Sequence, residues 1–176
     1  MRFTGPTPRN TLMDDIEEKK RLAAVCCVRN FDTSQEAAYE YITRLAASVC
    51  DVPIALIALV DDKCNWFLSS VGLQATATPR ELGFCAEAIK TPGDVFVVPD
   101  ASADVRFANH ALVVGVPYIR FYAGAPLVTS DGLALGTLCV IDSRPRELST
   151  DQLRELQFMA QQIITTIERK GALKKS

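Results

Sequence analysis

Histidine is nearly missing from this sequence, with His110 as the single example in 176 residues. Haem ligation and histidine-assisted serine or cysteine catalysis would therefore depend on that one side chain. The six cysteines form no C-x-x-C pair and show no other spacing typical of metal ligands. We therefore expect no metal site, and the sequence offers very little for binding haem.

An excess of charge of one sign is also lacking, because 19 basic residues face 21 acidic ones and the net charge is −2. A nucleic-acid-binding domain usually carries a basic patch or stripe, so no nucleic-acid partner is expected. No apolar run approaches the roughly 20 residues that span a bilayer, and residues 1–10 lack the apolar core of a secretory signal. We expect a cytoplasmic protein without membrane contact, whose cysteines remain thiols.

Apolar periodicity predicts two helices at the start of the chain and one at its end. The first is expected over 12–28 with Ile16, Ala23 and Cys26 on one face. The second is expected to be capped by Ser34, with an apolar face that carries Ala38, Tyr41, Leu45 and Val49. Ser149 and Gln152 form a capping box that opens the last helix, which runs to about 169.

Between these helices the sequence predicts strands at 54–60, 64–70, 95–98, 118–128 and 133–141, with a short helix at 84–90. The last two strands flank T-S-D-G and should form a hairpin. Tight turns between neighbouring strands require an antiparallel sheet. The long N- and C-terminal helices are expected on one face, and the middle loops with the short helix on the other, where they leave a pocket. The predicted class is therefore α+β.

Five segments carry a family resemblance. They are D-D-K-C-N-W-F-L-S-S-V-G-L (61–73), P-R-E-L-G-F-C-A-E-A-I (79–89), V-V-P-D-A-S-A-D-V-R-F-A-N (97–109), I-R-F-Y-A-G-A-P-L-V (119–128) and G-L-A-L-G-T-L-C-V-I-D (132–142). Together they closely resemble a GAF domain, of the subgroup that precedes histidine kinases and cyclic-dinucleotide enzymes. The resemblance implies a GAF-like (profilin-like) fold over 34–170, preceded by an arm and helix (1–33) and followed by a tail (171–176). It also implies a sensory function.

Eight residues are candidates for the ligand pocket: Trp66, Arg80, Phe84, Cys85, Asp100, Arg106, Phe107 and Arg120. Several have alternative structural explanations. Trp66 could stack on a planar ligand or anchor its strand. Arg80 could bind an anion or pair with Asp100 to hold the loop shut. Asp100, Asp104, Arg106 and Asn109 could line the pocket mouth or form Asx turns.

Cys85 opens the short helix, where the helix dipole can activate a thiol, although a buried structural role is the alternative. His110 is expected to face solvent. Arg120 lies in an aromatic run and could either reach the pocket or form its rim.

The resemblance also reduces the number of ligand classes to consider. The sequence lacks the Asn-Lys pair of cyclic-nucleotide-binding GAF domains and the Cys-His pair that holds a covalent bilin, so neither a bilin nor haem is expected. The cofactor is left open. One enzyme class with this fold reduces free methionine sulfoxide. Cys85 matches one of its cysteines, but 74–82 and 100–117 contain none.

We therefore expect a non-catalytic sensory or regulatory domain, which binds a small molecule or responds to redox state and couples this signal to an effector. The alternatives are a ligand-free dimerisation module and the sulfoxide reductase. The last helix is the candidate for a homodimer contact or for passing the signal to an effector. Its apolar stripe consists of Leu153, Leu156, Ala160, Ile163 and Ile167.

Overall fold

The computed structural model describes residues 11–31 and 36–170 as an α+β fold around one antiparallel sheet. The helices are α1 (Thr11–Phe31), α2 (Glu36–Cys50), α3 (Phe84–Ala88), α4 (Ala111–Val114) and α5 (Thr150–Arg169), with a 3-10 turn η1 (Arg80–Leu82). The strands are β1 (Ile54–Val60), β2 (Cys64–Val71), β3 (Ala77–Pro79), β4 (Phe96–Val98), β5 (Phe121–Val128) and β6 (Ala134–Asp142). The expected arm at 1–10, the cap at Ser34 and the tail at 171–176 lie outside the described residues.

The six strands are ordered β3-β2-β1-β6-β5-β4, so β1 and β6 form the centre of the sheet. Each pairing of neighbouring strands in the sheet is antiparallel, as predicted. The expected hairpin is confirmed as β5–β6, with Phe121 opposite Asp142 at its open end. Six of the seven residues of β1 and all nine of β6 are buried, because both faces of the sheet are covered.

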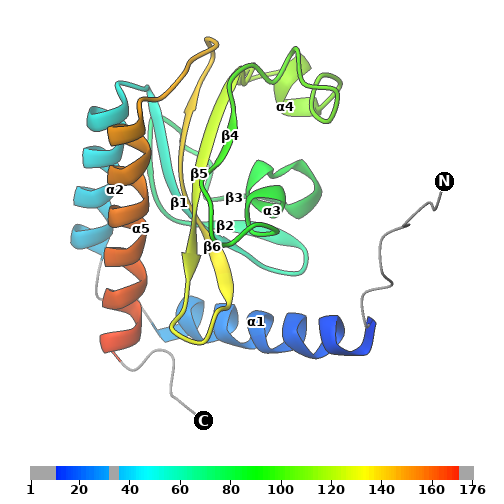
Figure 1. Cartoon of the computed structure of the whole chain (residues 1–176), viewed down its shortest axis with the longest axis vertical. Coiled ribbons are helices and arrows are strands. Elements are labelled where there is room, and N and C mark those ends of the chain that lie inside the picture. The colour runs from blue at the N-terminus through cyan, green and yellow to red at the C-terminus, as the bar shows by residue number, and fades with distance from the viewer. Residues whose placement is uncertain (1–10, 32–35, 171–176) are drawn as a thin grey trace, which may run out of the picture.

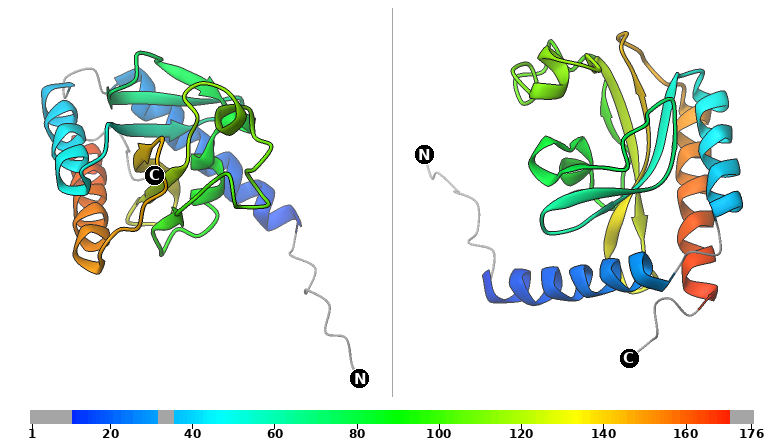
Figure 2. Two further views of the ribbon diagram at one scale, coloured as in Figure 1. Left: turned by 90° about the horizontal axis from the view of Figure 1, so that it is seen from above. Right: turned by 180° about the vertical axis from the view of Figure 1, so that it is seen from behind.

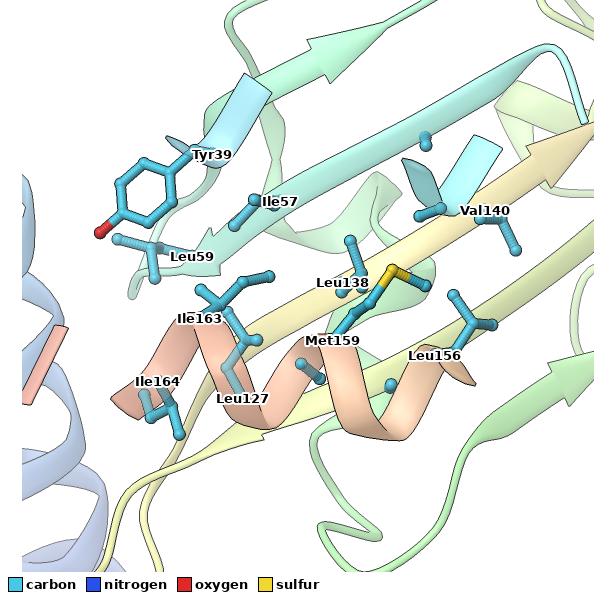
Figure 3. Close-up of a cluster of buried hydrophobic side chains, with 14 of the residues drawn as sticks. Tyr39, Ile57, Leu59, Leu127, Leu138, Val140, Leu156, Met159, Ile163 and Ile164 are labelled. Carbon is cyan, nitrogen blue, oxygen red and sulfur yellow. The ribbon is translucent and has the colours of Figure 1, made fainter. Parts of the chain in front are cut away.

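Helices α2 and α5 lie side by side over one face of the sheet (Figure 1). The capping box at Ser149 and Gln152 is present at the start of α5. From α5, Leu156 and Ile163 point toward the sheet, where Ile57, Leu59 and Leu138 lie (Figure 3). Ala160 and Ile167 are buried in the same cluster. Leu153 is half-buried. The stripe that was a candidate dimer contact is therefore intramolecular core, and a partner helix could reach it only by displacing the sheet.

The buried residues of α2 lie one or two positions after the predicted ones. Tyr39, Thr43, Ala46 and Cys50 are buried, whereas Ala38, Tyr41 and Leu45 are exposed and Val49 is half-buried. Thr43 meets the sheet because its Oγ1 bonds both the carbonyl of Tyr39 at 2.6 Å and Ser69 Oγ at 2.9 Å. A polar residue with satisfied hydrogen bonds thus occupies a position that hydrophobicity alone assigns to the surface.

We expected helix α1 to join α2 and α5 on the sheet face. It instead crosses the end of the sheet (Figures 1 and 2). Ile16, Ala23 and Cys26 are exposed, and the buried side is formed by Arg21, Val25 and Val28. Arg21 Nη1 donates to the carbonyl of Val60 at 2.6 Å and to that of Ala134 at 3.5 Å. A buried arginine that binds the ends of β1 and β6 therefore sets the orientation of α1.

The other face of the sheet carries α3, α4 and the connecting loops (Figure 2). These elements enclose a second apolar cluster, in which Phe84, Phe107, Val113 and Tyr122 are buried. None of the helices formed by the described residues is both long and apolar enough to cross a membrane. The described residues also contain no group of three or more histidine, cysteine or acidic side chains arranged to bind a metal ion.

Candidate functional site

A cleft of about 670 Å³ opens on the loop side of the sheet. Its walls are the β1–β2 turn with η1, the helix α3, and the loop that precedes α4. The lining residues carry charges of both signs around a small apolar patch: Asp62, Lys63, Arg80, Glu81, Gly83, Ala86, Glu87, Lys90, Arg106, Phe107 and His110. A concave site with convergent polar groups can bind a small molecule, and this lining is more charged than that of most such sites.

The wall at η1 and α3 is held against β2 by Asn65, which is buried at 1% exposure. Its Nδ2 donates to Thr78 Oγ1 at 3.3 Å and to the carbonyl of Pro79 at 3.2 Å. Gly83 permits this approach, because a Cβ there would lie 2.0 Å from Asn65 Nδ2. The absence of a side chain at Gly83 therefore lets the cleft wall pack directly onto the sheet.

Arg80 lies in the cleft wall, as predicted, but it does not pair with Asp100. Its Nη1 donates to Glu18 Oε1 on α1 and to the carbonyl of Asp61, both at 3.1 Å. Asp100 instead accepts bonds from the backbone N and the Oγ of Ser102, which form an Asx turn. The arginine thus joins the cleft to α1 and not to the long loop.

Arg106 lines the opposite wall, and its guanidinium is bound by a residue of the same loop. Its Nε and Nη2 donate to the two carboxylate oxygens of Asp104, at 3.0 and 2.7 Å. This hydrogen bonding from Arg106 lowers the pKa of Asp104. The guanidinium also lies 5.2 Å from the ring centre of Phe107 and 5.1 Å from that of Phe96, within cation–π range.

An aromatic stack forms the base of this wall. The ring of Phe84 stacks on Phe107 at 4.4 Å and on Tyr122 at 5.2 Å between centroids. Only Phe107 of these three lines the cleft, and Phe84 lies behind it at 3% exposure. Phe84 therefore supports the site without touching a ligand in the cleft.

His110 is half-buried and lines the cleft, although we expected it to face solvent. Its Nδ1 accepts a bond from the backbone N of Leu112 at 3.2 Å and so caps α4. Histidine is not among the usual N-cap residues, so the local sequence does not predict this role.

Cys85 is also behind the cleft wall, at 5% exposure, in a buried polar cluster with Tyr122, Thr137 and Cys139. Tyr122 Oη donates to its Sγ at 3.4 Å. The buried hydroxyl of Thr137 has no hydrogen-bond partner at ordinary distance among the described residues, so its proton is available to this sulfur. Hydrogen bonds from Cys139, Thr137 and Tyr122 lower the pKa of Cys85 to about 7, although burial opposes this. The pKa of Cys139 is raised by the same pairing.

The stability of the domain is expected to rise with pH between about 7 and 9 because of Cys85. The ordinary pKa of the thiol is 9.0, so in this window the unfolded chain retains a proton that the folded chain has released. The stabilisation is present above the unfolded pKa and is lost as the pH falls through the folded value. The slope is at most about 1.4 kcal/mol per pH unit. Urea unfolding of the wild type and of Cys85→Ala across this window measures it, and equal slopes would contradict the assignment.

Two further candidates lie outside the cleft. Trp66 is opposite Leu59 in the β1–β2 ladder and therefore shares the helix-side face of the sheet. Its Nε1 donates to Asp61 Oδ2 at 3.2 Å, and Arg29 of α1 lies 3.8 Å above its ring. Arg120 donates to the carbonyls of Val113 and Ile119, at 2.9 and 3.0 Å, and ties α4 to the start of β5. Both are structural in this fold.

The structure therefore brings Arg80, Arg106 and Phe107 together in the cleft but not the other five candidates. The charged side chains of the β1–β2 turn and of α3 were missed, because charged turn residues are normally solvated. A usable signal existed in α3 and the turn after it, where Ala86, Glu87 and Lys90 follow a helical spacing that places them on one side.

The profile of the GAF domain family matches residues 34–167 of this chain. The chain is a GAF domain. A curated relative, the cyclic di-GMP phosphodiesterase PA2567 of Pseudomonas aeruginosa, is 42% identical over 152 residues. That match covers 86% of this chain but only 26% of the relative, so the GAF domain corresponds to about a quarter of that protein.

Solved GAF domains share the fold at low sequence identity. The GAF domain of an Acinetobacter phosphoenolpyruvate-protein phosphotransferase aligns with a TM-score of 0.64 at 17% identity, over 95% of this chain and 98% of that one. The blue-light-absorbing form of the Thermosynechococcus elongatus PixJ GAF domain aligns with a TM-score of 0.61 at 17% identity, over 80% and 88% of the two chains. GAF domains are sensory domains of signalling proteins, and the expected class and fold are thereby confirmed.

Proposed function

We propose that this GAF domain is a non-catalytic cytoplasmic sensor that binds a small molecule in the cleft between the β1–β2 turn, α3 and the loop before α4. The cleft carries the proposal, because it combines charges of both signs with a phenylalanine face and an opening to solvent. No cysteine is among its lining residues. A small molecule in the cleft would therefore meet groups that can bind it but no thiol nucleophile, which argues against the reductase.

Ligand binding is favoured over redox sensing as the input. For redox sensing at Cys85, the cysteine beside the cleft wall, an oxidant would have to reach a side chain that is almost completely buried. All six cysteines lie in the described part of the chain and are free thiols, in keeping with a reducing compartment such as the cytoplasm. The relative suggests an effector that degrades cyclic di-GMP, joined to the domain or acting as its partner.

Filling the cleft should abolish ligand binding. Ala86 is half-buried and lines the cleft, so Ala86→Phe places a ring in the space that a ligand would occupy. We expect native mass spectrometry after incubation with a metabolite extract to show a bound small molecule on the wild type and at least tenfold less on Ala86→Phe, since the lost binding energy exceeds about 1.4 kcal/mol.

Ala38→Phe on the exposed side of α2 is the matched control and should bind like the wild type. Equal occupancy of Ala86→Phe and the wild type would place the ligand elsewhere, and an empty wild type would contradict small-molecule sensing. The proposed effector is tested separately, by measuring the concentration of cyclic di-GMP in cells that carry the Ala86→Phe allele. An unchanged concentration would argue against an effector that degrades cyclic di-GMP.

A homodimer is a second proposal, and the exposed apolar residues of α2 and α5 favour it. Tyr41 is 68% exposed, Leu45 39% and Phe158 58%. Helical spacing places Tyr41 and Phe158 opposite the buried sides of their helices, so both face outward from the paired helices. An exposed apolar surface of this kind is typical of an interaction site.

The double variant Tyr41→Glu, Phe158→Glu should remain folded and sediment as a monomer, whereas the wild type should sediment as a dimer. Burial of like charges at such an interface weakens association by several kcal/mol. Analytical ultracentrifugation measures the change. The exposed residues Arg44 and Gln161 serve as controls, as Arg44→Glu and Gln161→Glu. A wild type that is monomeric at all concentrations would exclude this dimer.

A further inference from the structure

Helix α1 is held to the end of the sheet by a cluster of charges that reaches into the cleft. Arg21 binds both carboxylate oxygens of Glu18, with Nε to Oε2 at 2.8 Å and Nη2 to Oε1 at 2.9 Å. Arg80 binds the same Oε1 from the cleft side at 3.1 Å. One carboxylate on α1 therefore serves two arginines, and only Arg80 belongs to the cleft.

The two arginines differ in how firmly they hold Glu18. The side chain of Arg21 is 7% exposed and binds two backbone carbonyls, whereas that of Arg80 is 32% exposed and binds one, the carbonyl of Asp61. The hydrogen bond from Arg21 is the largest influence that lowers the pKa of Glu18, and Arg80 contributes less. Glu18 would remain neutralised by Arg21 if Arg80 left it. The contact between Glu18 and Arg80 is thus the exchangeable one.

Beside Arg80, the cleft is lined by three charged side chains that form no ion pair with another described residue. The backbone N of Arg80 bonds the carbonyl of Lys63, which places the two cationic residues next to each other. No ion pair or side-chain hydrogen bond of Lys63, Asp62 or Glu81 occurs among the described residues, and all three line the cleft. Two cations can receive one anionic group, while the two carboxylates disfavour a second anion and favour a neutral or cationic remainder.

We propose that the cleft binds a small monoanionic or zwitterionic molecule whose carboxylate or phosphate takes the place of Glu18 on Arg80, and that this exchange loosens the first half of α1. The proposal rests on the proposed function and names its ligand class and its output. At the other cleft wall, Arg106 is already occupied by both oxygens of Asp104, which leaves Arg80 as the arginine open to exchange.

Hydrogen exchange of the α1 amides over 14–22 tests the coupling, first without any ligand. Arg80→Gln removes the contact with Glu18 but leaves Arg21 in place. We expect exchange in this segment to be roughly two- to fivefold faster than in the wild type, the effect of one lost partly exposed ion pair on local opening. Arg44→Gln, which removes an exposed ion pair with Glu40 on α2, should leave exchange in α1 unchanged.

The ligand class is tested with acetate, inorganic phosphate and glutamate as probes, at an ionic strength matched with sodium chloride. At saturation at least one should accelerate α1 exchange in the wild type to the level of Arg80→Gln, and none should accelerate it further in that variant. Acetate and phosphate distinguish a carboxylate from a phosphate group.

Wild-type exchange in Arg80→Gln would overturn the coupling. A wild type whose α1 exchange responds to none of the three probes would overturn the anionic ligand class. Neither result would affect the proposed function, which stands if the extract ligand still binds the wild type and not Ala86→Phe.

Discussion

Replacing Gly136 with alanine is expected to destabilise the domain by about 3 kcal/mol, at the upper end of the range for overpacked cores. Gly136 lies opposite Leu59 where β6 pairs with β1 at the centre of the sheet. A Cβ at this position would lie 1.8 Å from the carbonyl oxygen of Ala58 and 2.8 Å from the Cα of Leu59. Both atoms are backbone, so the two strands would have to separate.

Urea unfolding followed by circular dichroism measures this change. Gly93→Ala is the matched control, because a Cβ at Gly93 meets nothing within 4 Å, and its stability should stay within about 0.5 kcal/mol of the wild type. A loss of less than 1 kcal/mol in Gly136→Ala would show that β1 and β6 can move apart easily, contrary to the close packing of the central strands.

Ile163→Lys should prevent folding. Ile163 is fully buried between α5 and the sheet (Figure 3), where truncation alone typically costs about 2–5 kcal/mol. A lysine would add an unpaired charge, and the total approaches the whole stability of a small domain. Far-ultraviolet circular dichroism and sedimentation together measure the outcome.

The neighbouring residue provides the control for Ile163→Lys. Gln162 is exposed on the same helix, so Gln162→Lys introduces the same side chain without burying it and should fold normally. A folded, monomeric Ile163→Lys beside a dimeric wild type would mean that the stripe of α5 faces a partner chain. That result would restore the role that the helical spacing first suggested for these residues.

The elements that the sequence predicts well are those with a single dominant pattern. Helix α5 combines a capping box with one apolar stripe, and the β5–β6 hairpin is bounded by a clear turn. The buried sides of α1 and α2 were mispredicted, because Arg21 and Thr43 are buried through hydrogen bonds to distant backbone and side-chain atoms. Such contacts depend on the tertiary arrangement and leave no mark in local periodicity.

In the candidate site, too, some residues could be predicted from local sequence and others depend on the tertiary arrangement. Arg80, Arg106 and Phe107 were found because they lie in segments without regular patterning, which often form binding sites. For Trp66 the sequence left ligand stacking and anchoring of its strand as alternatives, because the neighbouring strand β1 is apolar at every position and so does not reveal which residues face the helices. The partner of Arg80 could not be predicted, since Glu18 lies 62 residues away in the sequence.

The position of Trp66 gives the domain an optical reporter of its own. It is the only tryptophan in the chain, and its indole lies beneath Arg29 of α1 and bonds the carboxylate of Asp61. Asp61 also accepts a bond from Arg80 through its carbonyl. The intrinsic fluorescence of the unlabelled protein should therefore change whenever α1 shifts or the cleft is occupied, so candidate ligands can be screened by emission alone.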